Sequence, residues 1–238
     1  IYQCVCMESI KSIFKIGNGP SSSHTMGPKT AAQLFKDRNP QAAQIKVTLY
    51  GSLAATGKGH LTDIAIQDAL SPLSTEFVWM PELVLPFHPN AMKFEAFDKM
   101  NSKIDEWTVY SIGGGKIADS NSHLAENHIY SQNSMSDILP FVEEQGKTFW
   151  EYVQDVEETD IWDYLNEVWK TMQAAVHEGL ETEGVLPGEL NLRRKAASYW
   201  VKAKSYKVSL QNRCLIMSYA LAVSEHNASG GVAGIAPE

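Results

Sequence analysis

Residues 16–28 read IGNGPSSSHTMGP, and in this stretch four hydroxyl side chains and an imidazole stand between glycine and proline residues. Pro28 suits the first turn of a helix, and apolar residues at positions 31, 32, 34 and 35 continue one helical face until Asn39 and Pro40 end it. The sequence therefore predicts that five polar residues, termed the serine turn, stand at the N-terminus of a helix: Ser21, Ser22, Ser23, His24 and Thr25.

The serine turn has two interpretations. A hydroxyl before a helix commonly accepts a hydrogen bond from a free N–H group of the first turn, and one such cap is sufficient. Five consecutive polar side chains instead favour an anion site, in which hydroxyl and backbone N–H groups converge on a carboxylate or phosphate at the positive end of the helix dipole. The residues alone leave both interpretations open.

A second glycine-rich stretch, GSLAATGKGHLTD at residues 51–63, follows an alternating strand predicted at residues 44–50. It does not fit a nucleotide-binding Walker A loop, because a glycine rather than a hydroxyl residue follows Lys58. Lys58 is a candidate anion ligand and His60 a candidate acid or base near neutral pH, with Thr62 close by. The alternative is a solvated loop on a flexible turn.

Serine, asparagine and histidine dominate between Asp119 and Ser136, which predicts a domain boundary or a long surface loop and divides the rest of the chain into two parts near residue 134. The first part mixes helices predicted at 7–16 and 64–70 with two strands, at 92–97 and 106–112, that form a hairpin; residues 72–89 are expected to be mostly loop. The second part is predicted to be helical, at 138–144, 148–156, 161–179, 192–201 and 210–225, with a flexible tail from Asn227. The fold class is therefore α+β, and Trp150, Trp162, Trp169 and Trp200 are expected in the core.

Composition excludes several classes of protein. The 238 residues carry a formal net charge of −8, so no basic face for a nucleic-acid backbone is expected. Neither a membrane-spanning apolar run nor a signal peptide is recognisable, which predicts a cytoplasmic protein. Cys4, Cys6 and Cys214 lack the number and spacing of a disulfide framework or a metal site. Residues 1–6 precede a methionine and are interpreted as either vector-derived or upstream sequence.

Six motifs together resemble the iron–sulfur-dependent L-serine dehydratases, also called L-serine ammonia-lyases. They are IGNGPSSSHTMGP, LYGSLAATGKGHLTD, FHPNAMKFEAFD, EWTVYSIGGG, EGVLPGELNLRRKA and ALAVSEHNASGG, in the family's order. The resemblance implies that residues 1–134 form the family's β domain, which is similar to the allosteric substrate-binding domain of phosphoglycerate dehydrogenase. Residues 135–238 would then be the first part of a truncated, helical α domain.

The resemblance also implies a reaction, the removal of water from L-serine to give, after hydrolysis, pyruvate and ammonia. In the family a [4Fe–4S] cluster acts as the Lewis acid, and no pyridoxal phosphate is implied. By resemblance His60 and Thr62 are catalytic, and the substrate-binding residues are Ser21, Ser22, Ser23, His24, Thr25, Lys58 and Asn227. The family's cluster-binding cysteines have no counterparts in this sequence, so we expect no metal ligands in this chain and no activity by the chain alone.

Two alternatives accompany this prediction. One is a non-catalytic regulatory module that binds L-serine or a related small acid through the serine turn and the segment around Lys58 and His60. The other is association into a homodimer, because a truncated helical domain would leave apolar surface uncovered.

Overall fold

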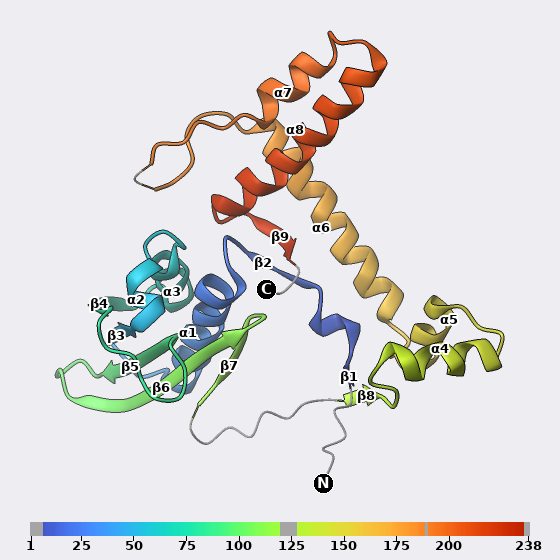
Figure 1. Cartoon of the computed structure of the whole chain (residues 1–238). Helices are drawn as coiled ribbons and strands as arrows, with labels where there is room; N and C mark the ends of the chain where they lie inside the picture. Colours follow the sequence, from blue (N-terminus) through green and yellow to red (C-terminus); the bar gives the residue numbers. More distant parts are fainter. Residues whose placement is uncertain (1–6, 120–127, 189, 236–238) are drawn as a thin grey trace.

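The computed structural model describes residues 7–119, 128–188 and 190–235. These residues have a mixed α+β architecture, as predicted. A five-stranded sheet with its helices forms one end of the molecule, and a group of longer helices extends from it (Figure 1). The specific likeness to a phosphoglycerate dehydrogenase domain stays a prediction.

The sheet has the strand order β4-β3-β5-β6-β7. Strands β3 and β4 run parallel, and the other neighbours are antiparallel. The strands span Gln44–Tyr50 (β3), Ser74–Met80 (β4), Ala91–Phe97 (β5), Lys103–Gly113 (β6) and Lys116–Ala118 (β7). The predicted strand at 44–50 and the predicted hairpin, now β5 and β6, are therefore confirmed.

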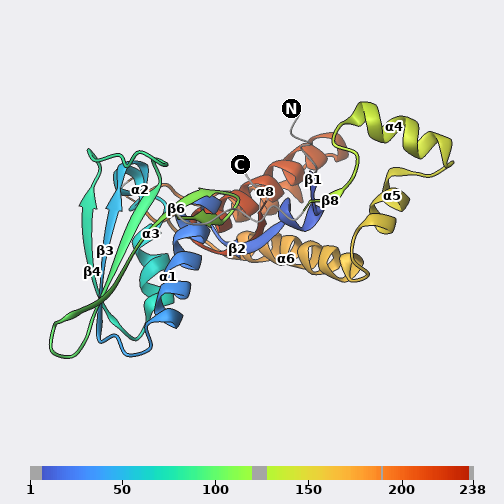
Figure 2. The same ribbon diagram turned by 90° about the horizontal axis from the view of Figure 1, so that it is seen from below.

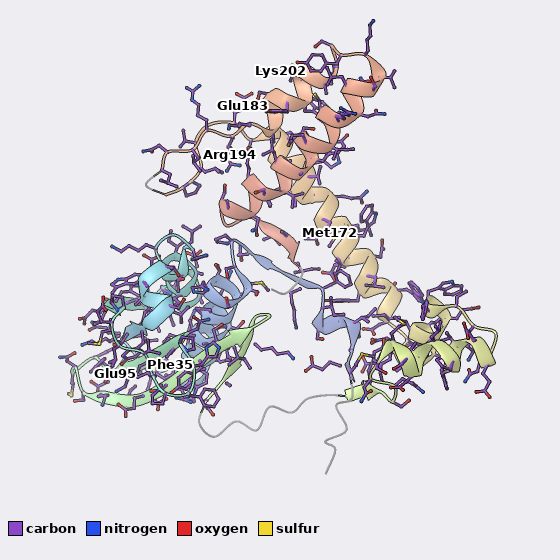
Figure 3. The ribbon with its side chains drawn as sticks, viewed as in Figure 1. Phe35, Glu95, Met172, Glu183, Arg194 and Lys202 are labelled. Carbon is purple, nitrogen blue, oxygen red and sulfur yellow. The ribbon has the colours of Figure 1, made fainter. Side chains whose placement is uncertain are left out.

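One face of the sheet forms the hydrophobic core of the N-terminal part of the chain. Ile45, Val47 and Leu49 alternate along β3 and are fully buried, because successive residues of a strand point to opposite faces. Helices α1 (Gly27–Arg38) and α3 (Thr62–Leu70) cover this face (Figure 2). Phe35 of α1, labelled in Figure 3, stacks on Phe94 of β5 with ring centroids 5.3 Å apart.

A short helix, α2 (Gly51–Thr56), follows β3 directly and contains the first half of the second glycine-rich stretch. Gly51 has a φ of +47°, and a Cβ at this position would lie 2.6 Å from the carbonyl oxygen of Pro89. Both observations require glycine. A turn at residues 57–61 then leads into α3 and places His60 near the serine turn.

The second part of the chain is mainly helical, with α4 (Met135–Glu144), α5 (Phe149–Val156), α6 (Ile161–Glu181), α7 (Ala196–Ala203) and α8 (Val208–Ala228). Helices α6 and α8 approach each other closely, since a Cβ at Gly179 would lie 2.2 Å from the carbonyl oxygen of Ala222. Helix α7 packs against α8 (Figure 1). These contacts bring the C-terminal end of α8 toward the start of the chain.

The N-terminal segment connects the two parts. Strand β1 (Met7–Glu8) pairs with β8 (His128–Tyr130), and a 3₁₀ turn, η1 (Ile10–Ser12), follows it. Strand β2 (Lys15–Asn18) then pairs antiparallel with β9 (Val232–Ile235). Because β2 leads directly into the serine turn, that turn begins next to the last described residues of the chain.

Several predictions of local structure were wrong. Residues 7–16 are not a helix, and residues 232–235 of the predicted flexible tail form a strand, because β2 and β9 supply each other's hydrogen bonds. Residues 72–89 are mostly loop, as predicted, and they also contain the strand β4, which pairs with β3. The helix predicted at 192–201 begins at Ala196. The three errors concern hydrogen bonds between distant segments or the position of a helix end, which local periodicity does not report.

The prediction that the tryptophans lie in the core was also wrong for three of them. Trp150, Trp162 and Trp169 are 55%, 46% and 59% exposed, whereas Trp200 is half-buried. Helical spacing identifies an apolar face, but only tertiary packing decides whether that face is covered.

Among the described residues, every helix is too short or too polar to span a lipid bilayer.

Candidate functional site

Four of the five residues of the serine turn, Ser22 to Thr25, lie in a π-helical turn, η2 (Ser22–Met26), that continues directly into α1. Ser21 precedes it in an extended conformation, and its hydroxyl accepts a hydrogen bond from the N–H of His24 at 3.2 Å. The predicted helix start with a serine cap is therefore confirmed. All four hydroxyl-bearing residues of the turn are nevertheless buried, and one cap does not account for that number.

Two histidines meet at this turn. The rings of His24 and His60 lie with their centroids 4.7 Å apart. His24 is held between two hydroxyls, with Nδ1 3.0 Å from Ser23 Oγ and Nε2 3.0 Å from Ser52 Oγ. Nδ1 of His60 lies 3.0 Å from the carbonyl oxygen of Thr56. Because a carbonyl only accepts, Nδ1 of His60 carries the hydrogen, and Nε2 of the neutral ring keeps a lone pair.

Two threonines hold the histidines in a reciprocal arrangement. Thr25 donates its hydroxyl hydrogen to the carbonyl oxygen of His60 at 2.8 Å, and Thr62 donates to the carbonyl oxygen of His24 at 2.6 Å. Thr62 is fully buried at the start of α3. Each threonine thus fixes the backbone of the histidine on the other segment.

Lys58 contacts a different part of the molecule. Its side chain is exposed, and its ammonium nitrogen lies 5.7 Å from the centroid of the Trp79 ring on the edge strand β4. The structure therefore brings His60 and Thr62 to the serine turn, and places Lys58 against the sheet edge.

Asn227 reaches the start of the serine turn from the C-terminal end of α8. Its side-chain N–H donates to the carbonyl oxygen of Pro20 at 3.1 Å. A Cβ at Gly19 would lie 2.1 Å from Asn227 Oδ1, so glycine permits the contact. The same segments are joined by a hydrogen bond from Gly19 N–H to the Gly231 carbonyl at 3.0 Å and one from the Asn18 side chain to the Gly230 carbonyl.

Four buried side-chain oxygens have no hydrogen-bond partner within the described part of the chain. They are Ser22 Oγ, Asn90 Oδ1, Ser111 Oγ and Asn227 Oδ1. Ser22 and Asn227 were predicted site residues, whereas Asn90 and Ser111 were not. Both lie within motifs that resemble the family, FHPNAMKFEAFD and EWTVYSIGGG, but a polar residue at a strand end carries no distinctive signal of its own.

Comparison with known proteins identifies the family. Residues 9–78 and 69–122 match the family described as serine dehydratase beta chain. The L-serine dehydratase of Haemophilus influenzae is 34% identical over 288 residues, an alignment that covers 97% of this chain and 63% of that protein. The chain is of the L-serine dehydratase beta-chain type.

Two further relatives agree with this assignment. L-serine dehydratase 1 of Escherichia coli is 32% identical, with 97% of this chain and 63% of the relative covered. The L-serine dehydratase of Streptomyces coelicolor is also 32% identical, with 96% of this chain and 62% of the relative covered. This beta-chain-type protein therefore spans somewhat less than two thirds of the length of these relatives.

The described residues do not fit the iron–sulfur cluster that the sequence resemblance implies. Such a cluster is held by several cysteine thiolates. Cys214 is the one cysteine inside the described ranges, since Cys4 and Cys6 lie outside them, and these ranges contain no group of three or more side chains suited to hold a metal ion. The described residues therefore do not supply the ligand set of such a cluster.

Proposed function

We propose that this chain provides the substrate-binding and proton-transfer part of an L-serine dehydratase, a lyase that converts L-serine to pyruvate and ammonia. The observation that carries the proposal is the position of His60, whose ring lies 4.7 Å from that of His24, centroid to centroid, beside the buried hydroxyls of the serine turn. The names of the relatives supply the substrate class.

The serine turn suits the polar groups of an amino acid. Ser22 Oγ is buried, without a hydrogen-bond partner among the described residues, in the first turn that leads into α1, where the helix dipole favours a carboxylate. Asn227 Oδ1, which is buried and likewise has no partner in these ranges, reaches the same segment from α8. In this proposal Ser21, Ser23 and Thr25 keep the turn in shape through their own hydrogen bonds.

His60 is the proposed base that removes the α-proton of L-serine. Its Nδ1–H donates to the Thr56 carbonyl, which leaves Nε2 as the acceptor for that proton. The tilted ring of His24 contacts the His60 ring, and Thr62 fixes the His24 backbone, so Thr62 is proposed as a positioning residue. Lys58 is proposed to contribute only general positive charge near the site.

Loss of the substrate hydroxyl also requires a Lewis or Brønsted acid, because hydroxide is a poor leaving group. The [4Fe–4S] cluster implied by the sequence resemblance would supply it from outside the residues described above. The proposal therefore assigns binding and proton transfer to this chain, and turnover to the complete enzyme.

Calorimetric titration of the full chain with L-serine tests the binding role. We expect binding, and we expect Ser22→Ala to weaken it about tenfold or more, since a hydrogen bond to a charged group is worth about 1.5–3 kcal/mol. Ser131→Ala removes an exposed serine outside the site and serves as the matched control. A folded chain that gives no heat with L-serine, or a Ser22→Ala variant that binds as well as wild type, would contradict the proposal.

The catalytic role is tested by His60→Ala in the complete enzyme, with pyruvate measured anaerobically. The variant is expected to bind L-serine within about threefold of wild type and to lose activity by about a hundredfold or more, the range of general-base catalysis. Wild-type rates in this variant would remove His60 from the mechanism. Binding of L-serine by the complete wild-type protein without any pyruvate would favour the regulatory module instead.

A further inference from the structure

Asn90 and Ser111 form a pair of buried polar side chains on neighbouring strands. Asn90 directly precedes β5, Ser111 lies in β6, and the N–H of Ser111 donates to the carbonyl oxygen of Asn90 at 2.9 Å. Ser111 is fully buried and Asn90 is 9% exposed. Asn90 Oδ1 and Ser111 Oγ have no hydrogen-bond partner among the described residues.

Ser111 packs against the serine turn where α1 begins. A Cβ at Gly27 would lie 2.2 Å from Ser111 Oγ and 3.6 Å from the carbonyl oxygen of Ser22. Only glycine at position 27 allows this approach. The hydroxyl of Ser111 therefore lies beside the turn that carries the unpaired hydroxyl of Ser22.

Asn90 is connected to the same turn from its other side. The carbonyl oxygen of the preceding residue, Pro89, accepts a hydrogen bond from Ser52 N–H at 3.2 Å. Ser52 Oγ in turn lies 3.0 Å from Nε2 of His24. Asn90 thus stands between Ser52 and Ser111, two residues that both contact the serine turn.

The chemistry of these three unpaired atoms indicates which ligand group they suit. An amide oxygen is only an acceptor, and the hydroxyls of Ser22 and Ser111 can also accept. A carboxylate cannot satisfy Asn90 Oδ1, because it has no hydrogen to donate. An ammonium group donates three hydrogens and carries a positive charge, so it is the complementary partner for three acceptors in a buried place.

We propose that Asn90, with Ser111 and Ser22, forms the subsite that accepts hydrogen bonds from the α-ammonium of the amino acid bound at the serine turn. The Ser22 hydroxyl donates its hydrogen to the carboxylate and accepts from the ammonium through a lone pair. The inference rests on the proposed function and adds to it a determinant of specificity. An amino acid is preferred over an acid of the same shape without an ammonium group, because only the amino acid satisfies Asn90 Oδ1.

Calorimetry of the full chain with two ligands tests the subsite. L-serine and 3-hydroxypropanoate share a carboxylate and a hydroxyl and differ by the ammonium group. We expect wild type to bind L-serine at least about tenfold more tightly. Asn90→Leu is expected to remove this preference by weakening L-serine alone, and Asn90→Asp, which keeps two acceptors, to retain it. Asn166→Leu, on the exposed face of α6, is the matched control.

The possible outcomes distinguish failure of the subsite proposal from failure of the proposed function. Equal weakening of both ligands by Asn90→Leu, or unchanged preference in that variant, overturns the subsite while L-serine binding still stands. If wild type binds neither ligand, the proposed function fails and the subsite fails with it. Thermal unfolding of the variants without ligand measures the effect of each substitution on stability. Asn90→Leu removes a buried acceptor that has no partner among the described residues, so it should not lower the unfolding midpoint. A lowered midpoint in both Asn90 variants would show that Asn90 stabilises the fold rather than binding the ammonium group.

Discussion

Replacement of Glu157 by alanine is expected to destabilise the junction between the N-terminal segment and the helical part. Glu157 is 7% exposed, and its carboxylate accepts three hydrogen bonds: from the hydroxyl of Tyr130 at 2.6 Å, from the hydroxyl of Ser9 at 2.6 Å and from the N–H of Ile10 at 2.8 Å. Two of these donors lie 147 or more residues before Glu157 in the chain, so the contact is entirely tertiary.

The expected decrease in the free energy of unfolding follows from the three donors that lose their acceptor. A buried donor left unpaired costs about 1 kcal/mol or more, so Glu157→Ala should lower the free energy of unfolding by about 3 kcal/mol. For a chain of this size each kcal/mol shifts the unfolding midpoint by about 2–4 °C, which predicts a decrease of about 6–12 °C. Tyr130→Phe removes one of the three donors and should lose about a third of this amount.

Differential scanning calorimetry of the full-length variants provides the measurement. Glu158→Ala is the matched control, because this neighbouring carboxylate is 82% exposed and pairs only across the surface with Lys11. The control should leave the midpoint nearly unchanged. If Glu157→Ala shifts the midpoint no more than Glu158→Ala does, the buried carboxylate does not stabilise the junction and the reasoning is refuted.

Two further predictions concern the site and the alkaline pH range. Gly19→Ala would place a Cβ 2.1 Å from Asn227 Oδ1, so it should separate α8 from the serine turn and weaken L-serine binding about tenfold; unchanged affinity in calorimetry would show that Asn227 is not needed. Burial and the hydrogen bond to Glu157 raise the pKa of Tyr130 well above its ordinary value. The unfolded chain therefore releases this proton first, and stability should fall as pH rises above about 10. Urea unfolding between pH 8 and 11 should show a smaller fall in Tyr130→Phe, and equal falls would contradict the assignment.

The local pattern of apolar residues was sufficient to predict those helices and strands in which buried residues recur at a regular spacing. Ile45, Val47 and Leu49 predicted β3 because a strand with one buried face alternates, and the apolar spacing of residues 64–70 predicted α3. The glycine and proline residues around the serine turn predicted the start of α1. These features depend on neighbours within one or two turns of the chain.

The composition of the site could be predicted only in part. His60, Thr62 and Asn227 contact the serine turn or the residues beside it in the structure, and their chemical roles stay predictions. Lys58 contacts Trp79 instead, because the turn at residues 57–61 directs its side chain to the sheet edge. Asn90 and Ser111 were missed because an unpaired buried oxygen is recognised only when its surroundings are known.

The sequence by itself determined the α+β class, the main helices and strands, and the cluster of hydroxyl residues at a helix start, since all of these follow from local periodicity and backbone preference. Only the tertiary structure decided that β2 pairs with β9, that the ring of His24 contacts the ring of His60, and that Asn227 reaches Pro20 across 207 residues. The physical reason is that hydrogen bonds and ring contacts between distant segments depend on how the core packs. That packing brings α8, the serine turn and the turn before α3 to one place, and no short stretch of sequence encodes it.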